Sequence, residues 1–411
     1  MNTTLHSIRC LLLSSRLLRS LRGACLIACG LIVATATNAK AEYTFTLVAD
    51  SAGPFRNFYF PSPSLNAGGT VAFAANLDDG RLGIFTGNGG VVTTIALGAL
   101  PNGSFGYPSI NQAGTVAFFA TEGNGVGERI VSGSGGPLTT VADASGQFRG
   151  FASGYSVSIN TTGTVAFWAS QDTGPAGIFI NSGGTVTSGF LNSAPLFAEF
   201  NASINDNGTV AFRTSNGTGI LTVADGLITT ITDSSGPFNY FGRAPSLNNA
   251  GRVAFVAGIN GIDGGVFGIY TGNGEPLTTI ADLSGQFSYL GDFNFNQPPI
   301  NAAGNVAFVA GLDAGGGGIF IGDGTTTSQI LDARAPFFGS TLTGVGISPT
   351  SLNDSGQVAF YYELANGTTG IAIATPVPEP SSVGLLVFGA LGILSGRSRK
   401  LARRSSKSHE K

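Results

Sequence analysis

The chain has 411 residues, of which 63 are glycine and only 10% are charged, against ~25% charged residues in an average globular protein. Between residues 42 and 375 there is no Cys, His, Met or Lys, and eight arginines stand against 21 acidic residues, so this part has a formal charge of −13 while the whole chain has −3. These features exclude Ser-His-Asp and Cys-His nucleophiles, lysine Schiff bases, Walker A phosphate loops and zinc, copper or haem sites, and they disfavour nucleic acid as a partner.

Residues 1–41 are typical of a secretory signal peptide. Four arginines precede an apolar run over residues 24–36, and Ala39-Lys40-Ala41 follows it. A basic region, an apolar stretch of ~7–15 residues and an Ala-x-Ala site are the parts of such a signal, so we expect signal peptidase to cleave after Ala41. Two alternatives stay open. One is a retained anchor, although ~20 apolar residues are normally needed to span a bilayer. The other is a lipoprotein signal at residues 26–29, Leu-Ile-Ala-Cys.

The middle of the chain, residues 42–375, is one unit repeated seven times. The pattern Asn-x-x-Gly-x-Val-Ala-Phe recurs without a mismatch at intervals of 43 to 53 residues. Asn followed three positions later by Gly favours a tight turn in which Gly takes a positive φ. Alternate residues of Val-Ala-Phe face opposite sides of a strand, and because both sides are apolar, we expect burial on both faces. The copies begin at Asn66, Asn111, Asn160, Asn205, Asn248, Asn301 and Asn353.

Each unit has room for four short strands. A Gly-Ile phrase follows the repeat Asn in most units, and a Thr-Thr-aliphatic-Ala-Asp phrase comes later. Four strands in ~45 residues are the signature of a β-propeller blade. Residues 43–50 form a fourth-strand phrase ahead of the first repeat, whereas the last unit has none. We therefore predict an all-β, seven-bladed β-propeller of four-stranded blades that the N-terminal strand closes, with an open β-solenoid as the alternative.

The repeats resemble those of the bacterial family named for tandem NxxGxVAF repeats, whose members carry varied surface-anchoring tails. This resemblance covers about residues 43–375. The longer phrase Pro-Ser-Leu/Ile-Asn-x-x-Gly-x-Val-Ala-Phe is also similar to the blade repeat of TolB-type propellers. The second resemblance implies a propeller, as the strand pattern does.

Residues 376–411 contain the three parts of a sorting signal in order. Val377-Pro378-Glu379-Pro380 precedes a short apolar stretch, residues 383–394, and a basic cluster. Prolines break regular structure and basic residues stay on the cytoplasmic side, so we expect residues 376–380 to be unpaired and the body of the chain to lie outside. The cluster comprises Arg397, Arg399, Lys400, Arg403 and Arg404.

This order resembles a PEP-CTERM signal, although the tail 401–411 is longer than usual. The resemblance implies a Gram-negative host that makes exopolysaccharide, and an exosortase as the processing protease. The alternative is that the short transmembrane helix is retained as an anchor.

A repeated aspartate ends the fourth-strand phrase in five units. Carboxylates are calcium ligands, and the alternative is that each Asp caps a turn through its side chain. No loop has the dense Asp/Asn alternation of a calcium loop, so we favour turn caps and expect no cofactor. The residues are Asp50, Asp143, Asp233, Asp282 and Asp332.

Paired carboxylates are the catalytic option that the composition leaves, because a glycosidase needs only two acids at a suitable separation. Most acids here recur as structural repeats, whereas a catalytic pair should be unique to one or two blades. For the single tryptophan, Trp168, core packing is favoured over sugar stacking.

We therefore expect an exported, non-enzymatic binding or structural protein of the cell surface or extracellular matrix. Its expected partners are extracellular polysaccharide or a surface protein, and its contact with the inner membrane is expected to be transient. A carboxylate-dependent glycan hydrolase or lyase is the alternative.

Overall fold

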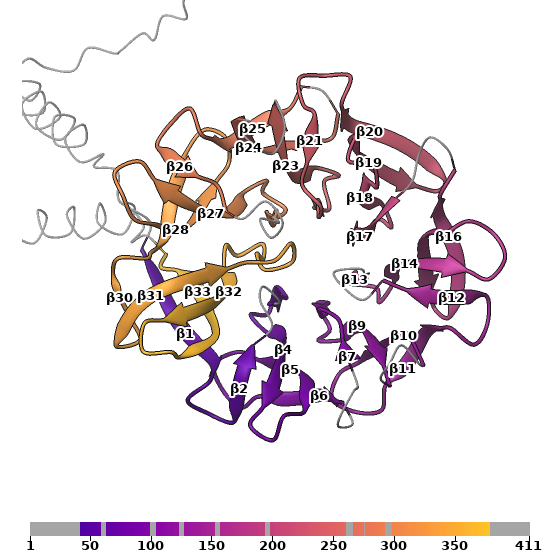
Figure 1. Cartoon of the computed structure of the whole chain (residues 1–411), viewed down its shortest axis with the longest axis horizontal. Coiled ribbons are helices and arrows are strands. Elements are labelled where there is room, and N and C mark those ends of the chain that lie inside the picture. Colours follow the sequence, from indigo (N-terminus) through magenta and orange to yellow (C-terminus); the bar gives the residue numbers. More distant parts are fainter. Residues whose placement is uncertain are drawn as a thin grey trace, which may run out of the picture. The chain divides into compact units, whose positions relative to one another are not determined.

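The computed structural model describes residues 42–58, 63–98, 104–122, 127–152, 157–193, 198–259, 266–274, 276–291 and 298–378. These residues form seven antiparallel sheets, and Figure 1 shows them arranged as blades around a common centre. Within a blade the strands follow one another outward, and the inner strand is split into two short pieces in several blades. Within these ranges there is no helix with the length and hydrophobicity needed to span a membrane.

The strands of each blade are given from the inner to the outer one. Blade 1 comprises β2 (Phe55–Phe58), β3 (Ser64–Leu65), β4 (Val71–Leu77), β5 (Leu82–Gly87) and β6 (Thr93–Leu97). Blade 2 comprises β7 (Ser104–Phe105), β8 (Ser109–Ile110), β9 (Val116–Thr121), β10 (Arg129–Gly133) and β11 (Thr139–Asp143). Blade 3 comprises β12 (Phe148–Phe151), β13 (Val157–Ile159), β14 (Val165–Gln171), β15 (Gly177–Ser182) and β16 (Thr185–Leu191).

The remaining blades follow the same order. Blade 4 comprises β17 (Ala198–Ile204), β18 (Val210–Thr214), β19 (Gly219–Ala224) and β20 (Leu227–Asp233). Blade 5 comprises β21 (Tyr240–Phe241), β22 (Ser246–Leu247), β23 (Val253–Ile259), β24 (Val266–Gly272) and β25 (Thr278–Asp282). Blade 6 comprises β26 (Phe287–Tyr289), β27 (Val306–Leu312), β28 (Gly317–Gly322) and β29 (Thr327–Asp332). Blade 7 comprises β30 (Pro336–Phe337), β31 (Ser340–Gly346), β32 (Val358–Leu364), β33 (Thr369–Pro376) and β1 (Tyr43–Asp50).

Blade 7 joins the two ends of the described chain. Strand β1 pairs antiparallel with β33, from Tyr43 opposite Pro376 to Asp50 opposite Gly370. Beyond this ladder, the N–H of Val377 donates to the carbonyl of Glu42 over 2.8 Å. The expected closure by the N-terminal strand is therefore confirmed, and the open solenoid is wrong. The pairing also corrects one expectation, because the first two residues of the stretch 376–380 are hydrogen-bonded and not unpaired.

The hydrophobic core consists of seven clusters, each shared by two neighbouring blades. The cluster between blades 2 and 3 contains Val165 and Phe167, while Ala166 belongs to the cluster between blades 3 and 4. The last cluster joins blade 7 to blade 1 through residues such as Ile371 and Phe73. Each Val-Ala-Phe strand thus buries both faces, with the small residue on one side, as the repeat pattern predicts.

The repeat glycines take the backbone conformation that the turn pattern requires. Gly163 has a φ of 84°, in the left-handed region that a β-branched residue resists. The other six lie between 77° and 87°, at Gly69, Gly114, Gly208, Gly251, Gly304 and Gly356. The assignment of a tight turn to Asn-x-x-Gly is therefore confirmed.

The seven repeat asparagines form a closed cycle of hydrogen bonds. In each, the side-chain Oδ1 accepts the N–H of the residue four positions later over 2.9–3.0 Å. The Nδ2 donates to the backbone carbonyl of the repeat Asn in the next blade over 2.9–3.4 Å. The bond from Asn353 to Asn66 completes the cycle. All seven side chains are buried, so each bond lies away from competing water. We call this the asparagine cycle.

The first prediction concerns closure. A chain beginning at Ser51 lacks β1, exposes the edge of β33 and uncovers Val48 and Ala49, which are buried in the cluster between blades 7 and 1. We expect it to lose several kcal/mol of the ~5–15 kcal/mol that stabilises a typical domain, and to melt much earlier than a chain beginning at Glu42. Equal thermal melting of the two chains would contradict the latch function of β1.

The second prediction concerns the asparagine cycle. Asn205→Asp keeps the acceptor for Thr209 but replaces the donor to Asn248 with a buried charge facing a carbonyl. We expect a loss of ~2–4 kcal/mol in denaturant unfolding. Asn207→Asp is the matched control, since Asn207 makes a similar bond to Asn249 at an exposed place in the same turn. A loss of more than about 1 kcal/mol in the control, or none at Asn205, would contradict the argument.

Candidate functional site

The blades present two different faces. In each blade, the Asn-x-x-Gly turn and the hairpin between the third and outer strands lie at the same end of the antiparallel sheet. We call this side of the ring the turn face. The hairpins between second and third strands and the links between blades lie at the other end, the loop face. Six of the eight arginines lie in these hairpins and links or within two residues of them: Arg56, Arg81, Arg129, Arg149, Arg213 and Arg334. Arg252 follows a repeat turn on the turn face.

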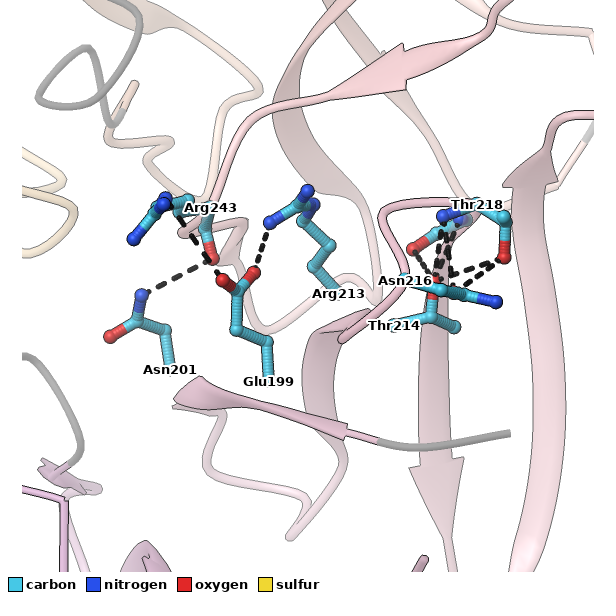
Figure 2. A network of polar contacts seen from close by, with 8 residues as sticks. Glu199, Asn201, Arg213, Thr214, Asn216, Thr218 and Arg243 are labelled. Atoms are coloured by element: carbon cyan, nitrogen blue, oxygen red, sulfur yellow. Dashed lines mark hydrogen bonds and ion pairs between the residues drawn. The ribbon is translucent and has the colours of Figure 1, made fainter. Parts of the chain in front are cut away.

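The candidate site is a buried ion pair between the inner and second strands of blade 4, at the loop face. Glu199 on β17 and Arg213 on β18 form a salt bridge, and both side chains are only 12% exposed. The more exposed Arg243 brings its Nε to 4.0 Å from the other carboxylate oxygen. Figure 2 shows Glu199 directed at both guanidinium groups, while Asn201 Nδ2 donates to the Arg243 carbonyl over 3.3 Å. Blades 4 and 5 are therefore joined by a charged contact.

An irregularity in the inner strand creates this contact. The pairing of β17 with β18 shifts register between Ala198 and Ala202, so residues 199–201 bulge out of the ladder. A bulge redirects side chains and is common beside functional sites. The neighbouring β21 and β22 of blade 5 leave a similar break, in which Arg243 lies. Sequence reasoning missed this cluster because none of its residues belongs to a repeat phrase. The signal that might have found it is that Glu199 has no counterpart in the other inner strands.

The carboxylate of Glu199 is held between two guanidinium groups, because one oxygen pairs with Arg213 and the other lies 4.0 Å from Arg243 Nε. The Nε of Arg213 is buried without a hydrogen-bond partner among the described residues. This donor and the exposed Arg243 could both donate hydrogen bonds to a ligand that has acceptor oxygens.

The centre of the ring is filled by a segment of blade 7. Ser348 Oγ donates to the carbonyl of Pro63 over 2.5 Å, and Ser246 Oγ donates to the carbonyl of Pro349 over 2.9 Å. The carbonyl of Thr350 accepts the N–H of Leu65 over 2.8 Å. Residues 348–350 thus bind blades 1 and 5, and the cavity that they line with residues of blades 2 to 5 has a volume of only about 40 Å³. This cavity is too small for a sugar or a peptide.

The five repeated aspartates cap turns, as the favoured interpretation predicts. In each, Oδ1 accepts the backbone N–H of the residue two positions later, from Ala52, Ser145, Ser235, Ser284 or Arg334. The hydroxyl and N–H of Ser145 lower the pKa of Asp143 below its usual value. Within the described ranges, no group of three or more His, Cys, Asp or Glu residues is arranged to hold a metal ion.

Blade 2 carries two glutamates at the hairpin between its second and third strands, where the equivalent hairpins of blades 1, 3 and 6 carry aspartates. Glu122 and Glu128 flank the hairpin between β9 and β10 on the loop face. Glu122 accepts from the Arg129 guanidinium over 2.8 Å, and Glu128 accepts the N–H of Phe151 in blade 3 over 2.9 Å. Each of the two carboxylates thus already has a partner within the protein.

The remaining sequence-based sites are only partly described. Val377 is exposed and donates to Glu42, and Pro378 follows it. The other expected processing residues, Ala39, Ala41, Glu379 and Pro380, lie outside the described residues, as do Arg397, Arg399, Lys400, Arg403 and Arg404. Trp168 is half-buried and packs against the cluster between blades 3 and 4, which agrees with core packing.

The third prediction compares a buried with an exposed glutamate. Glu199→Ala leaves the Arg213 guanidinium buried without its counter-charge, so we expect a loss of ~3 kcal/mol in denaturant unfolding. Glu122→Ala is the control, because Glu122 pairs with Arg129 at a carboxylate that is 64% exposed and should contribute less than ~1 kcal/mol. The buried contact would be misassigned if the two variants unfolded alike.

The solved structures that the fold matches have low sequence identity. An oligogalacturonate lyase from Vibrio parahaemolyticus has a TM-score of 0.49 at 13% identity, with 83% of this chain and 99% of that chain covered. A xyloglucanase from Xanthomonas campestris has a TM-score of 0.49 at 12% identity, covering 79% and 53%. YCF48 from Cyanidioschyzon merolae has 0.45 at 10%, covering 80% and 99%. At these scores, the matches support no statement about the chemistry of this chain.

Sequence comparisons identify two segments. Comparison with curated proteins gives no match. The Family of unknown function (DUF7453) matches residues 200–347 and 336–384, and the PEP-CTERM protein-sorting motif matches residues 376–400. The expected sorting signal is therefore confirmed, and it implies an exported, surface-sorted protein that an exosortase processes. The likeness to the NxxGxVAF family stays a resemblance. The chain is a seven-bladed β-propeller in which residues 200–384 match the model of a family of unknown function, and it ends in a PEP-CTERM protein-sorting motif over residues 376–400.

Proposed function

We propose that this protein is a non-enzymatic binding or structural protein of the cell surface or extracellular matrix, associated with extracellular polysaccharide and released from its tail by the sorting protease. The observation that carries the proposal is the closed ring between Glu42 and Val377. Because these two residues are hydrogen-bonded to each other, cuts after Ala41 and within the stretch 376–380 leave every strand of the ring in place.

The state of the acidic residues supports a binding function. The unique glutamates of the described chain each accept a hydrogen bond from the protein, as Glu363 does from the Tyr361 hydroxyl over 2.7 Å. The aspartates of the links are held in turns by backbone N–H groups. A hydrolase or lyase needs one carboxyl group free to take or give a proton. The carboxylates of Glu122, Glu128, Glu199 and Glu363 are instead used for contacts within the ring.

The alternative function is a carboxylate-dependent glycan hydrolase or lyase, and its candidate catalytic residues are in blade 2. Glu122 and Glu128 are two glutamates beside one hairpin of the loop face, and two carboxyl groups on one face are the minimum that such an enzyme needs. The test must therefore separate binding of polysaccharide from cleavage of it.

The fourth prediction uses the extracellular polysaccharide of the native host. Incubated with the ring from Glu42 to Pro378, the polysaccharide should be retained on the immobilised protein, and its chain length in size-exclusion chromatography should not change. Progressive shortening that the double variant Glu122→Gln, Glu128→Gln abolishes would replace the proposal by the enzymatic alternative. Neither retention nor shortening would contradict polysaccharide association. Intact mass spectrometry of the surface fraction tests release, because a species that still contains residues 397–411 would contradict it.

A further inference from the structure

Exposed aliphatic side chains gather at the hairpins between third and outer strands, on the turn face. Val91 in blade 1 is 92% exposed and Leu227 in blade 4 is 73% exposed, the two highest values among the exposed large hydrophobic residues. Ile228 and Leu138, in blades 4 and 2, are also exposed. Single exposed aliphatics are ordinary, but here they occur at equivalent hairpins of three blades, of which blades 1 and 2 are neighbours. We call these hairpins, residues 88–92, 134–138 and 225–228, the turn rim.

The C-terminal tail leaves the ring beside the turn rim. Blade 7 has no hairpin at this place, because β33 ends there and β1 begins there. Val377, which is exposed, follows β33 and is fixed by its bond to Glu42. In the adjacent blade 1, the hairpin that carries Val91 touches β1, since a Cβ added to Gly89 would meet the methyl group of Thr46. The exit and the most exposed aliphatic residue are therefore on neighbouring blades.

The tail is too short to hold the ring far from a membrane. Five residue steps separate Pro378 from Val383, where the apolar stretch of the sorting motif begins. At ~3.3–3.6 Å per residue, a fully extended chain of this length reaches at most about 18 Å. As long as the apolar stretch is in the bilayer, the point of exit must stay close to the headgroups, and the rest of the turn face is the surface nearest to them.

The charge on this face limits the kind of lipid contact. The ring contains no lysine, and Arg252 on the turn face donates to the hydroxyls of Thr271 and Thr278. The acids of the face include Asp206 and Asp354, which accept N–H groups from neighbouring blades. Attraction to anionic headgroups therefore cannot drive the contact, whereas burial of aliphatic side chains can.

We propose that the turn rim is a lipid-docking surface that rests on the bilayer while the tail is still attached. The inference rests on the proposed function, because it needs the membrane-bound precursor. Val91 in blade 1 and Leu138 in blade 2, the two blades that follow the exit, insert at the level of the headgroups. The loop face with its arginines and glutamates faces away from the membrane. The contact is apolar, so it forms on zwitterionic lipid and withstands salt. Removal of the tail ends it, because few side chains contribute.

The experiment compares two ends of the same blade in the full chain. Cys10, Cys25 and Cys29 are replaced by Ser, and one cysteine is introduced by Val91→Cys or by Leu97→Cys. Leu97 is the matched control, since it is also exposed and ends β6 at the loop face. Each variant carries the same fluorophore and is reconstituted into phosphatidylcholine vesicles with brominated acyl chains. We expect the label at 91 to be quenched at least ~twofold more than the label at 97, at low and at high salt.

The outcomes separate docking from the proposed function. Where the protein floats with the vesicles, equal quenching of the labels at 91 and 97, or stronger quenching of the label at 97, overturns docking. Either result leaves the proposed function standing. Failure of the full chain to float with vesicles overturns both. Loss of quenching at high salt overturns the apolar contact. A second measurement places the label at 138 by Leu138→Cys. Val91→Asp should lower the quenching of the label at 138, whereas Leu97→Asp should leave it unchanged. Equal effects of the two substitutions would also overturn the inference.

Discussion

The asparagine cycle is the constraint on which the rest of the structure depends. A turn cap needs only an acceptor, and Asp or Ser supplies one as well as Asn does. The amide of Asn adds a donor, and in this ring the donor reaches the carbonyl of the next repeat Asn. Each blade is therefore held to the next one by a buried hydrogen bond of 2.9–3.4 Å. The seventh bond returns to the first blade, so the cycle holds the seven blades at a similar spacing at the turn face.

Variation between blades consequently lies outside the Asn-x-x-Gly turns, in the hairpins and in the links between blades. The repeat starts are 43 to 53 residues apart, and no length change falls within the seven Asn-x-x-Gly-x-Val-Ala-Phe segments. The glutamates Glu122, Glu128 and Glu199 lie outside these segments, in a hairpin and in an inner strand. A ring held at one face can tolerate bulges such as residues 199–201 at the other, because the asparagine cycle and the shared clusters keep the blades in register. This division separates the part that holds the fold from the part that can recognise a ligand.

The sequence predicts whatever the repeat encodes and nothing that depends on a single blade. Strand order, burial of Val-Ala-Phe and the positive φ of Gly163 follow from local pattern, and closure follows from the displaced strand 43–50. The partners of Glu199 do not, because Arg213 and Arg243 meet it only through a bulge and a neighbouring blade. The position of residues 348–350 at the centre of the ring could not be predicted for the same reason, since the carbonyl of Pro349 accepts a hydrogen bond from Ser246 in blade 5. One signal was available: Asn never alternates with Asp in seven repeats, which indicates a required donor.

Closure also connects folding to sorting. The paired strands β1 and β33 are separated by more than three hundred residues, as the bond from Thr44 to the carbonyl of Thr375 shows. Contacts of such separation form late, because a long loop must be closed before they add stability. Blade 7 can therefore be completed only when Pro376 is present, and the last bond of the ring, from Val377 to Glu42, lies at the edge of the sorting motif. A cut on the C-terminal side of Val377 preserves that bond, whereas a cut within β33 opens the ring. The folded ring thus sets the N-terminal limit of the segment that can be removed without loss of the fold.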